Sequence, residues 1–204
     1  MAWTTPKTWS AGAALTKAEL DEQIRDNEVW LKAALTAIGQ TSDSTFGQLK
    51  TAAYGCMLNR TAAQTITDAT DTVITFPSGS VTEELDSDGL HSGVTNSARI
   101  TIPAGGDGVY LIGGNVRWET NSSGVRVLWA EYNGSAGTGT VISESRIAPT
   151  GGGTTQTSQL VSTVYLLASG DYVTLNVRQT SGASRDIQSA GFSARFYALR
   201  LFSV

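Results

Sequence analysis

The chain has 204 residues, of which 40% are hydrophobic, and a formal net charge of −4. This length suffices for one domain with a sizeable core and a small additional segment. An acidic chain does not offer the basic face that binds a phosphate backbone, so we expect no nucleic-acid partner.

The first element is an arm over residues 2–15 that carries Trp3, Pro6 and Trp9. This arm is too short to fold alone, and large aromatic side chains are a common source of binding energy. We therefore expect Trp3 and Trp9 to dock on another protein, with a flexible tail as the alternative.

A single helix is predicted next, because Thr16 and Glu19 have the spacing of an N-terminal capping box. The following residues alternate spacings of four and three, which is a heptad pattern typical of self-associating helices: Leu20, Ile24, Asn27, Leu31, Ala34 and Ile38. The polar Asn27 would set the register of such a coiled coil. Trp30 and Leu35 leave a second interpretation open, in which the helix packs on the β-domain.

Gly39 ends the helix, and the polar residues 39–51 are suited to a linker. We therefore divide the chain into an attachment or trimerisation segment, residues 1–50, and a β-domain, residues 51–204.

The β-domain is recognised by apolar residues with a period of two, bounded by glycine-rich turns. Three segments show this pattern most clearly: Tyr110, Ile112, Val116 and Trp118 in residues 108–118; Val125, Val127 and Trp129 in residues 125–132; and Val173, Leu175 and Val177 in residues 171–179. About eight to ten antiparallel strands of this kind predict a sandwich or a barrel.

The last strand has apolar residues on both faces. The alternation places Phe192, Phe196 and Phe202 on one face and Tyr197, Leu199 and Leu201 on the other. One face can fill the core, so we expect Tyr197, Leu199 and Leu201 to form the interface of a homo-oligomer.

Two polar loops, residues 133–140 and 150–157, are candidates for ligand contacts because small polar residues make adaptable hydrogen bonds. The candidate residues in these loops are Asn133, Gly134, Thr138 and Thr154.

No pattern in the sequence predicts catalysis, a metal site or a cofactor. His91 is the one histidine, and its turn-rich surroundings predict a solvated side chain. Glu83 and Glu84 are adjacent on a strand and should point to opposite faces, so they could not act together as the carboxylate pair of a glycosidase. Cys56, also the one residue of its type, is predicted to be buried in a strand.

The N-terminus has neither the basic nor the apolar region of a signal peptide, and no apolar run reaches the length of a membrane span. We therefore expect synthesis in a cytoplasm and no membrane insertion.

Residues 8–32 resemble the N-terminal attachment motif of tailed-bacteriophage structural proteins. Its elements are Thr8-Trp9, Leu15-Thr16, Ile24-Arg25-Asp26-Asn27 and Leu31-Lys32. This resemblance implies a phage or prophage origin and attachment to other virion proteins.

The β-domain is similar to the globular domain of the complement and tumour-necrosis-factor superfamily. The similarity lies in Gly108-Val109-Tyr110, in Leu167 with Gly170-Asp171 and Val173, and in the strand from Phe192 to Leu201. It implies a jelly roll of about ten strands that assembles as a tight homotrimer, and it implies no particular ligand.

Together these features predict a mainly β protein, an antiparallel jelly-roll sandwich preceded by an extended arm and one helix. The expected function is that of a non-enzymatic, homotrimeric knob on the virion exterior, which either decorates the capsid or forms a short head or tail fibre. The main alternative is a tail-tip protein that binds a host surface glycan or protein. A carbohydrate depolymerase and a cytokine-like ligand are further alternatives.

Overall fold

The structure is a computed structural model, and it describes residues 54–149, 156–189 and 193–204. The predicted arm, helix and linker lie outside these residues, together with Trp3, Trp9, Leu20, Ile24, Asn27 and Leu31. Thr154 and Phe192 also lie outside them. None of the described residues belongs to a helix that is long and apolar enough to cross a membrane.

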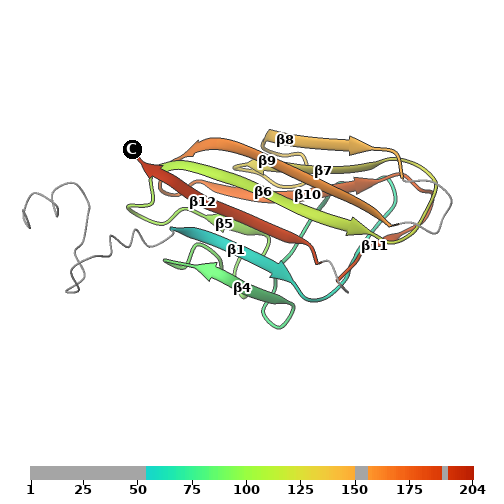
Figure 1. Cartoon of the computed structure of the whole chain (residues 1–204), viewed down its shortest axis with the longest axis horizontal. Coiled ribbons are helices and arrows are strands. Elements are labelled where there is room, and N and C mark those ends of the chain that lie inside the picture. Colours follow the sequence, from blue (N-terminus) through green and yellow to red (C-terminus); the bar gives the residue numbers. More distant parts are fainter. Residues whose placement is uncertain (1–53, 150–155, 190–192) are drawn as a thin grey trace, which may run out of the picture. The chain divides into compact units, whose positions relative to one another are not determined.

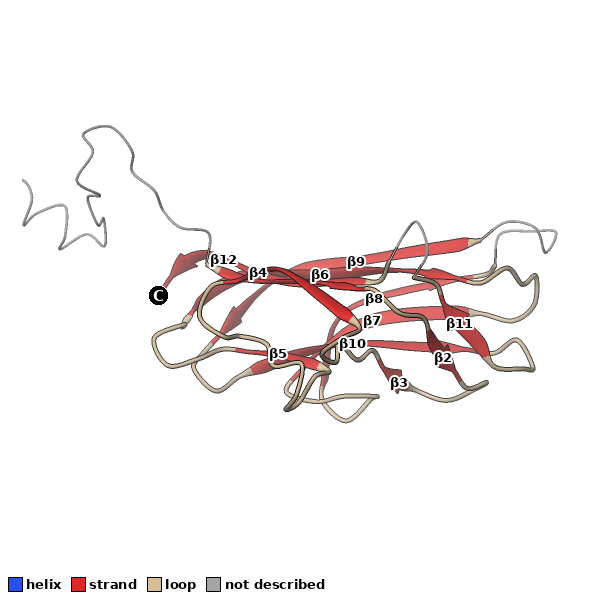
Figure 2. Cartoon of the chain, turned by 90° about the horizontal axis from the view of Figure 1, so that it is seen from below, coloured by secondary structure: helices blue, strands red, loops and turns tan. Residues whose placement is uncertain are grey.

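The described residues form twelve strands in two antiparallel sheets, which Figure 2 shows as two layers. The first, sheet A, contains β4 (Val81–Asp86), β1 (Gly55–Arg60), β12 (Arg195–Ser203), β6 (Gly108–Trp118) and β9 (Thr157–Leu167), with β11 (Arg185–Ile187) and β2 (Gln64–Ile66) continuing from β6. The second, sheet B, contains β3 (Thr72–Val73), β10 (Tyr172–Gln179), β7 (Arg126–Tyr132) and β8 (Thr140–Ile147), with β5 (Arg99–Thr101) also paired to β10.

The core lies between the sheets and is built from the alternating apolar residues of the strands. In β6 the predicted inward face is confirmed, because Tyr110, Ile112, Val116 and Trp118 are fully buried. In β10 the same holds for Val173, Leu175 and Val177, and Cys56 of β1 is buried as predicted. The period-two pattern therefore identified the inner face of the central strands.

The prediction for Phe202 is wrong, because the pairing of β12 with β6 shifts between Arg200 and Phe202. Leu201 has no partner on β6 at this bulge, and Phe202 lies opposite Val109. An extra residue in one strand reverses the faces of the residues that follow it. Phe202 is therefore 58% exposed on the outer face, whereas Phe196 remains in the core.

The prediction of a solvated His91 is also wrong. Its side chain is fully buried, and Nδ1 lies 2.8 Å from Oε1 of Glu83 on β4. The ring also packs edge-on against Phe76, with centroids 6.4 Å apart. Residues 87–98 between β4 and β5 fold back over the core, and this brings a histidine from a turn-rich sequence into the interior.

The two ends of the sandwich carry different loops (Figure 1). The start of β1 and the C-terminus lie at one end, where the backbone N–H of Arg200 donates to the carbonyl of Tyr54 at 2.8 Å. Residues 133–139 lie at the same end, because Asn133 is hydrogen-bonded to the turn after β9. The strands that flank residues 148–156 end at the opposite end, where Thr157 pairs with Trp118. β8, with 8 residues, leads from the loop of Asn133 to Ala148, so the described residues on either side of residues 150–155 lie at the opposite end of the sandwich from Asn133.

Candidate functional site

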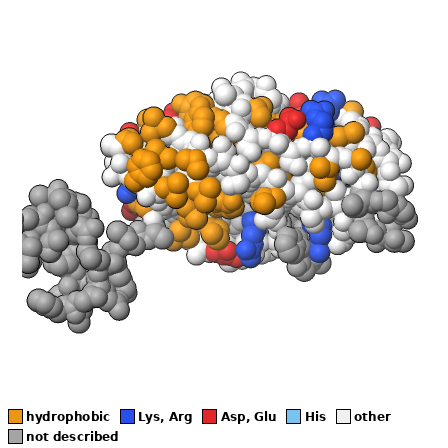
Figure 3. All heavy atoms as spheres, turned by 45° about the horizontal axis from the view of Figure 1, so that its top comes forward, with side chains coloured by type: hydrophobic (Ala, Val, Ile, Leu, Met, Phe, Trp, Pro, Cys, Tyr) orange, Lys and Arg blue, Asp and Glu red, His pale blue; other side chains and the backbone are white. Residues whose placement is uncertain are grey.

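The most exposed apolar surface of the described residues lies on the outer face of sheet A. Eight large apolar side chains are exposed in the described ranges, and six of them lie on β9 or at the C-terminal end of the chain: Leu160, Val164, Leu166, Leu201, Phe202 and Val204. We call these six residues, with Val109, Leu111, Tyr197 and Leu199, the apolar face. In Figure 3 hydrophobic side chains gather on the half of the domain that carries the C-terminus.

Cross-strand pairing places the members of the apolar face in rows. One row contains Leu199 of β12, Leu111 of β6 and Val164 of β9, and the next contains Phe202, Val109 and Leu166. Residues that pair directly across strands share a face and lie in contact range. The bulge in β12 therefore completes the second row, because without it Phe202 would point into the core.

Tyr197 extends the apolar face over a glycine. A Cβ atom added to Gly113 would lie 2.5 Å from the Tyr197 hydroxyl oxygen and 2.8 Å from Cζ of its ring. The ring therefore lies flat across β6 and points toward β9, in a space that any side chain at position 113 would occupy. The predicted interface residues Tyr197 and Leu199 are half-buried on this face, and Leu201 is 53% exposed.

Charged residues border the apolar face at its other end. The Arg195 guanidinium lies 3.3 Å from Oε1 of Glu84, and the Asn59 amide donates to the same oxygen at 3.4 Å. Glu83 instead contacts His91, so Glu83 and Glu84 point to opposite faces as predicted. Two carboxylates on opposite sides of a sheet cannot flank one glycosidic bond.

In the first candidate ligand loop, residues 133–140, the polar atoms of Asn133 and Thr138 are hydrogen-bonded within the domain. The Asn133 amide donates to Asp171 at 2.8 Å and its Oδ1 accepts from the backbone N–H of Tyr172 at 2.9 Å. The Thr138 hydroxyl accepts from the Ser135 N–H and donates to the Ser135 carbonyl. Gly134 is buried, so Asn133 and Thr138 shape the loop and Gly134 offers no surface to a ligand.

Asp171 is the centre of this hydrogen-bonded turn. Burial opposes ionisation of its carboxyl, but donors from the Ala168 N–H, Asn133 and Tyr132 outweigh burial and lower the pKa of Asp171. The bond to Asp171 in turn raises the pKa of the Tyr132 hydroxyl. Hydrogen bonds to a carboxylate stabilise its charged form.

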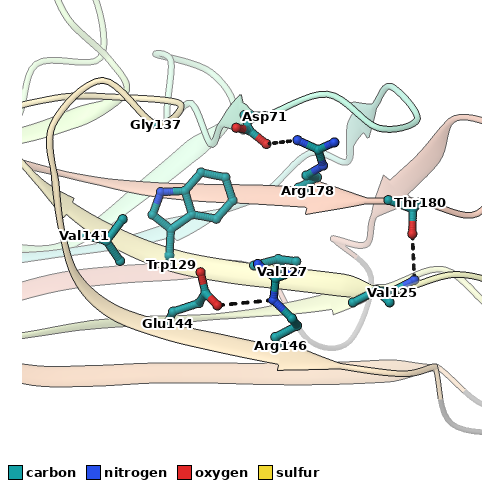
Figure 4. A pocket seen from close by; sticks show the side chains of 10 residues that line it. All are labelled: Asp71, Val125, Val127, Trp129, Gly137, Val141, Glu144, Arg146, Arg178 and Thr180. Atoms are coloured by element: carbon teal, nitrogen blue, oxygen red, sulfur yellow. Dashed lines mark hydrogen bonds and ion pairs between the residues drawn. The ribbon is translucent and has the colours of Figure 1, made fainter.

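A second surface feature, a groove with a volume of about 410 Å³, lies on the outer face of sheet B (Figure 4). Its floor contains Val127 and Trp129, and Figure 4 shows these two side chains between two ion pairs. One pair joins Arg178 and Asp71 at 3.0 Å, and the other joins Arg146 and Glu144 at 3.3 Å. The sequence pattern placed Val125, Val127 and Trp129 on one face, but it held no signal for the groove, because Asp71 and Arg178 are 107 residues apart.

A single buried carboxylate holds this floor in place. The Trp129 indole N–H donates to Oε2 of Glu131 at 3.1 Å, and the backbone N–H of Gly137 donates to the same oxygen at 3.0 Å. Gly139 donates to the other oxygen of Glu131. Glu131 thus ties the indole ring to the loop that follows β7.

The described residues contain no group of three or more His, Cys, Asp and Glu side chains placed to hold a metal ion. Burial raises the pKa of the Cys56 thiol, and the nearby carboxylates of Asp86 and Glu83 raise it further. A thiol in this state is a poor nucleophile.

No protein-family model matches the sequence, and no curated protein matches it. Solved structures match in fold. The crystal structure of murine APRIL at pH 8.0 aligns with a TM-score of 0.52 and 13% identity, over 73% of this chain and 99% of that chain. The structure of Eiger TNF from S. frugiperda aligns with a TM-score of 0.51 and 11% identity, over 74% and 94% of the two chains. The described residues thus form an antiparallel jelly roll of the tumour-necrosis-factor type, which confirms the predicted fold class of the β-domain.

Proposed function

We propose that the chain is a non-enzymatic structural protein of a bacteriophage virion, a homotrimeric knob that its N-terminal segment attaches to the particle exterior. The observation that carries the proposal is the apolar face of sheet A. Surfaces on which several large apolar side chains lie together are typical of association sites, because their burial removes apolar area from water. A second and a third copy of the same chain would cover this face with no other partner required.

The position of residue 54 supports attachment through the N-terminal segment. Tyr54 lies beside Arg200, near the end of the last strand and therefore near the apolar face. In a symmetric trimer packed through that face, the three N-terminal segments would leave the knob at the same end. Three segments that start close together suit attachment to one platform on a capsid or a tail, and the phage-type motif of residues 8–32 supports such a platform.

Three versions of this proposal differ in where the protein lies on the particle. A capsid decoration protein would be distributed over the head, and a short fibre would be confined to one or a few positions. The alternative, a receptor-binding protein that recognises a host surface glycan or protein, would be confined to the tail tip. In each form the protein reaches the virion exterior after synthesis in the host cytoplasm.

Electron microscopy of intact particles, labelled with a gold-tagged antibody against the knob, tests the proposal. We expect gold on every particle, and its absence from purified virions would refute a structural role. Gold over the whole head would select decoration, whereas gold at the tail end would select the fibre or the receptor-binding form.

Deletion of residues 1–50 tests the mode of attachment. We expect the shortened protein to remain a folded trimer and to be absent from particles. Incorporation of the shortened protein would instead show that the β-domain makes the contact with the virion.

A further inference from the structure

The groove on the outer face of sheet B combines an apolar floor with two polar walls. We propose that it binds an uncharged, hydroxyl-rich ligand, a neutral saccharide. This inference does not rest on the trimer, because the groove lies on sheet B and the apolar face lies on sheet A.

The floor supplies a narrow apolar strip that is already in position. Val127 and Trp129 are each 5% exposed, and Val141 of β8 adds a side chain that is 49% exposed. The bond from Trp129 to Glu131 holds the indole ring, and the bonds from Gly137 and Gly139 to Glu131 hold the adjacent loop. A ligand would therefore not have to order this floor, which lowers the entropic cost of binding.

The walls supply accessible donors and acceptors. Asp71 and Arg178 have exposed side-chain fractions of 37% and 42%, and Glu144 and Arg146 have fractions of 42% and 64%. Each ion pair is joined through one carboxylate oxygen, Oδ1 of Asp71 and Oε1 of Glu144. In the part of the chain that the structure describes, the second oxygens, Oδ2 and Oε2, accept no hydrogen bond and can accept one from a ligand.

The charges of the walls select an uncharged ligand. Two carboxylates and two guanidinium groups sum to zero, and each charge already has a partner of opposite sign. An anionic ligand would have to displace a carboxylate from its arginine, and a cationic ligand would have to displace an arginine. A hydroxyl group can donate to a carboxylate and accept from a guanidinium while both ion pairs stay intact.

A pyranose ring has the matching chemistry, with C–H groups on its face and hydroxyl groups around its edge. Its face would lie mainly on the exposed side chain of Val141 and on the accessible edges of Val127 and Trp129, and its hydroxyls would reach both walls. The volume of about 410 Å³ lies within the range of about 300–1,000 Å³ that is usual for small-ligand sites.

Calorimetric titration of the full chain with defined trisaccharides tests this inference. The neutral probes are maltotriose, cellotriose, mannotriose and triacetylchitotriose, and the acidic probe is trigalacturonic acid. We expect binding of at least one neutral probe, and we expect Arg178→Met and Glu144→Gln each to weaken it at least about tenfold. Arg185→Met is the matched control, because Arg185 pairs with Glu119 at 2.9 Å and does not line the groove.

Three results would overturn the inference. They are no binding of any neutral probe, binding of the acidic probe alone, and neutral binding that both wall variants leave unchanged. Thermal unfolding of each variant identifies any loss of affinity that comes from misfolding. A monomeric protein that still binds a neutral probe would refute the trimer and leave the groove assignment standing.

Discussion

Replacing Val164 with aspartate should separate the proposed homotrimer into folded monomers. Val164 is 55% exposed at the centre of the apolar face, opposite Leu111. In an isolated protomer the new carboxylate would remain in water, so the change in folding free energy should stay within about 1 kcal/mol. In the trimer each of the three carboxylates would be buried without a partner.

The cost to the trimer can be estimated from these positions. Burying a whole valine side chain stabilises by about 1.5–3 kcal/mol. Only the exposed part of Val164 would become buried on assembly, so its contribution to the interface is about 1 kcal/mol. An unpaired buried charge adds about 3 kcal/mol or more. About 4 kcal/mol for each protomer gives about 12 kcal/mol for the trimer, or about nine decades in its equilibrium constant. The protomer concentration at which half of the chains are assembled varies with the inverse square root of this constant. That midpoint concentration should therefore rise by about four decades.

Sedimentation velocity over a concentration series measures this shift. The control is Val94→Asp, the same substitution at a loop position that is 87% exposed and lies outside the apolar face. We expect the wild type and Val94→Asp to be trimers at about 10 µM, and Val164→Asp to be a monomer with an unchanged circular dichroism spectrum. A monomeric wild type, or a Val164→Asp trimer with the same midpoint as the control, would refute the assignment of the interface.

Three further experiments test contacts within the domain. Glycine to alanine usually stabilises a strand, but Gly113→Ala should destabilise the fold by about 1–3 kcal/mol. The reason is that the new Cβ would lie 2.5 Å from the Val161 carbonyl oxygen and from the Tyr197 hydroxyl. A raised urea midpoint would contradict this close contact. Asp171→Asn should lower the free energy of unfolding at neutral pH. The difference in this free energy from the wild type should shrink as the pH falls below the ordinary pKa of 3.8, because a lowered pKa stabilises the fold only above that range. Urea unfolding at several pH values measures this difference, and a constant difference would contradict the lowered pKa of Asp171. The Cys56 thiol should not react with a disulfide reagent at neutral pH until the protein unfolds, since burial raises its pKa; fast labelling of the native protein would show that β1 opens readily.

Much of the β-domain could be predicted because strand formation leaves a local pattern. Apolar residues at every second position have to share one face of a strand, so the inward residues of β6 and β10 could be identified from spacing alone. The opposite directions of Glu83 and Glu84 follow from the same rule, and the burial of Cys56 follows from the apolar character of a free cysteine. The same spacing predicts that Tyr197 and Leu199 lie on the face opposite Phe196, and their role in an interface stays a prediction.

Other features could not be predicted, because they depend on which strands pair and in what register. The bulge before Phe202 is set by the pairing of β12 with β6, and the spacing of the phenylalanines along the chain does not predict it. His91 looked solvated because its neighbours are turn residues, yet the return of its loop to β4 places it beside Glu83.

The amino-acid sequence by itself determined the fold class and the inner faces of the central strands, because backbone geometry ties side-chain direction to residue spacing. Only the tertiary structure decided where surfaces from distant segments meet. It brought Asp71 to Arg178 beside Trp129, and it brought His91 to Glu83 in the interior. Those arrangements follow from how strands and loops pack against one another, and no local pattern encodes them.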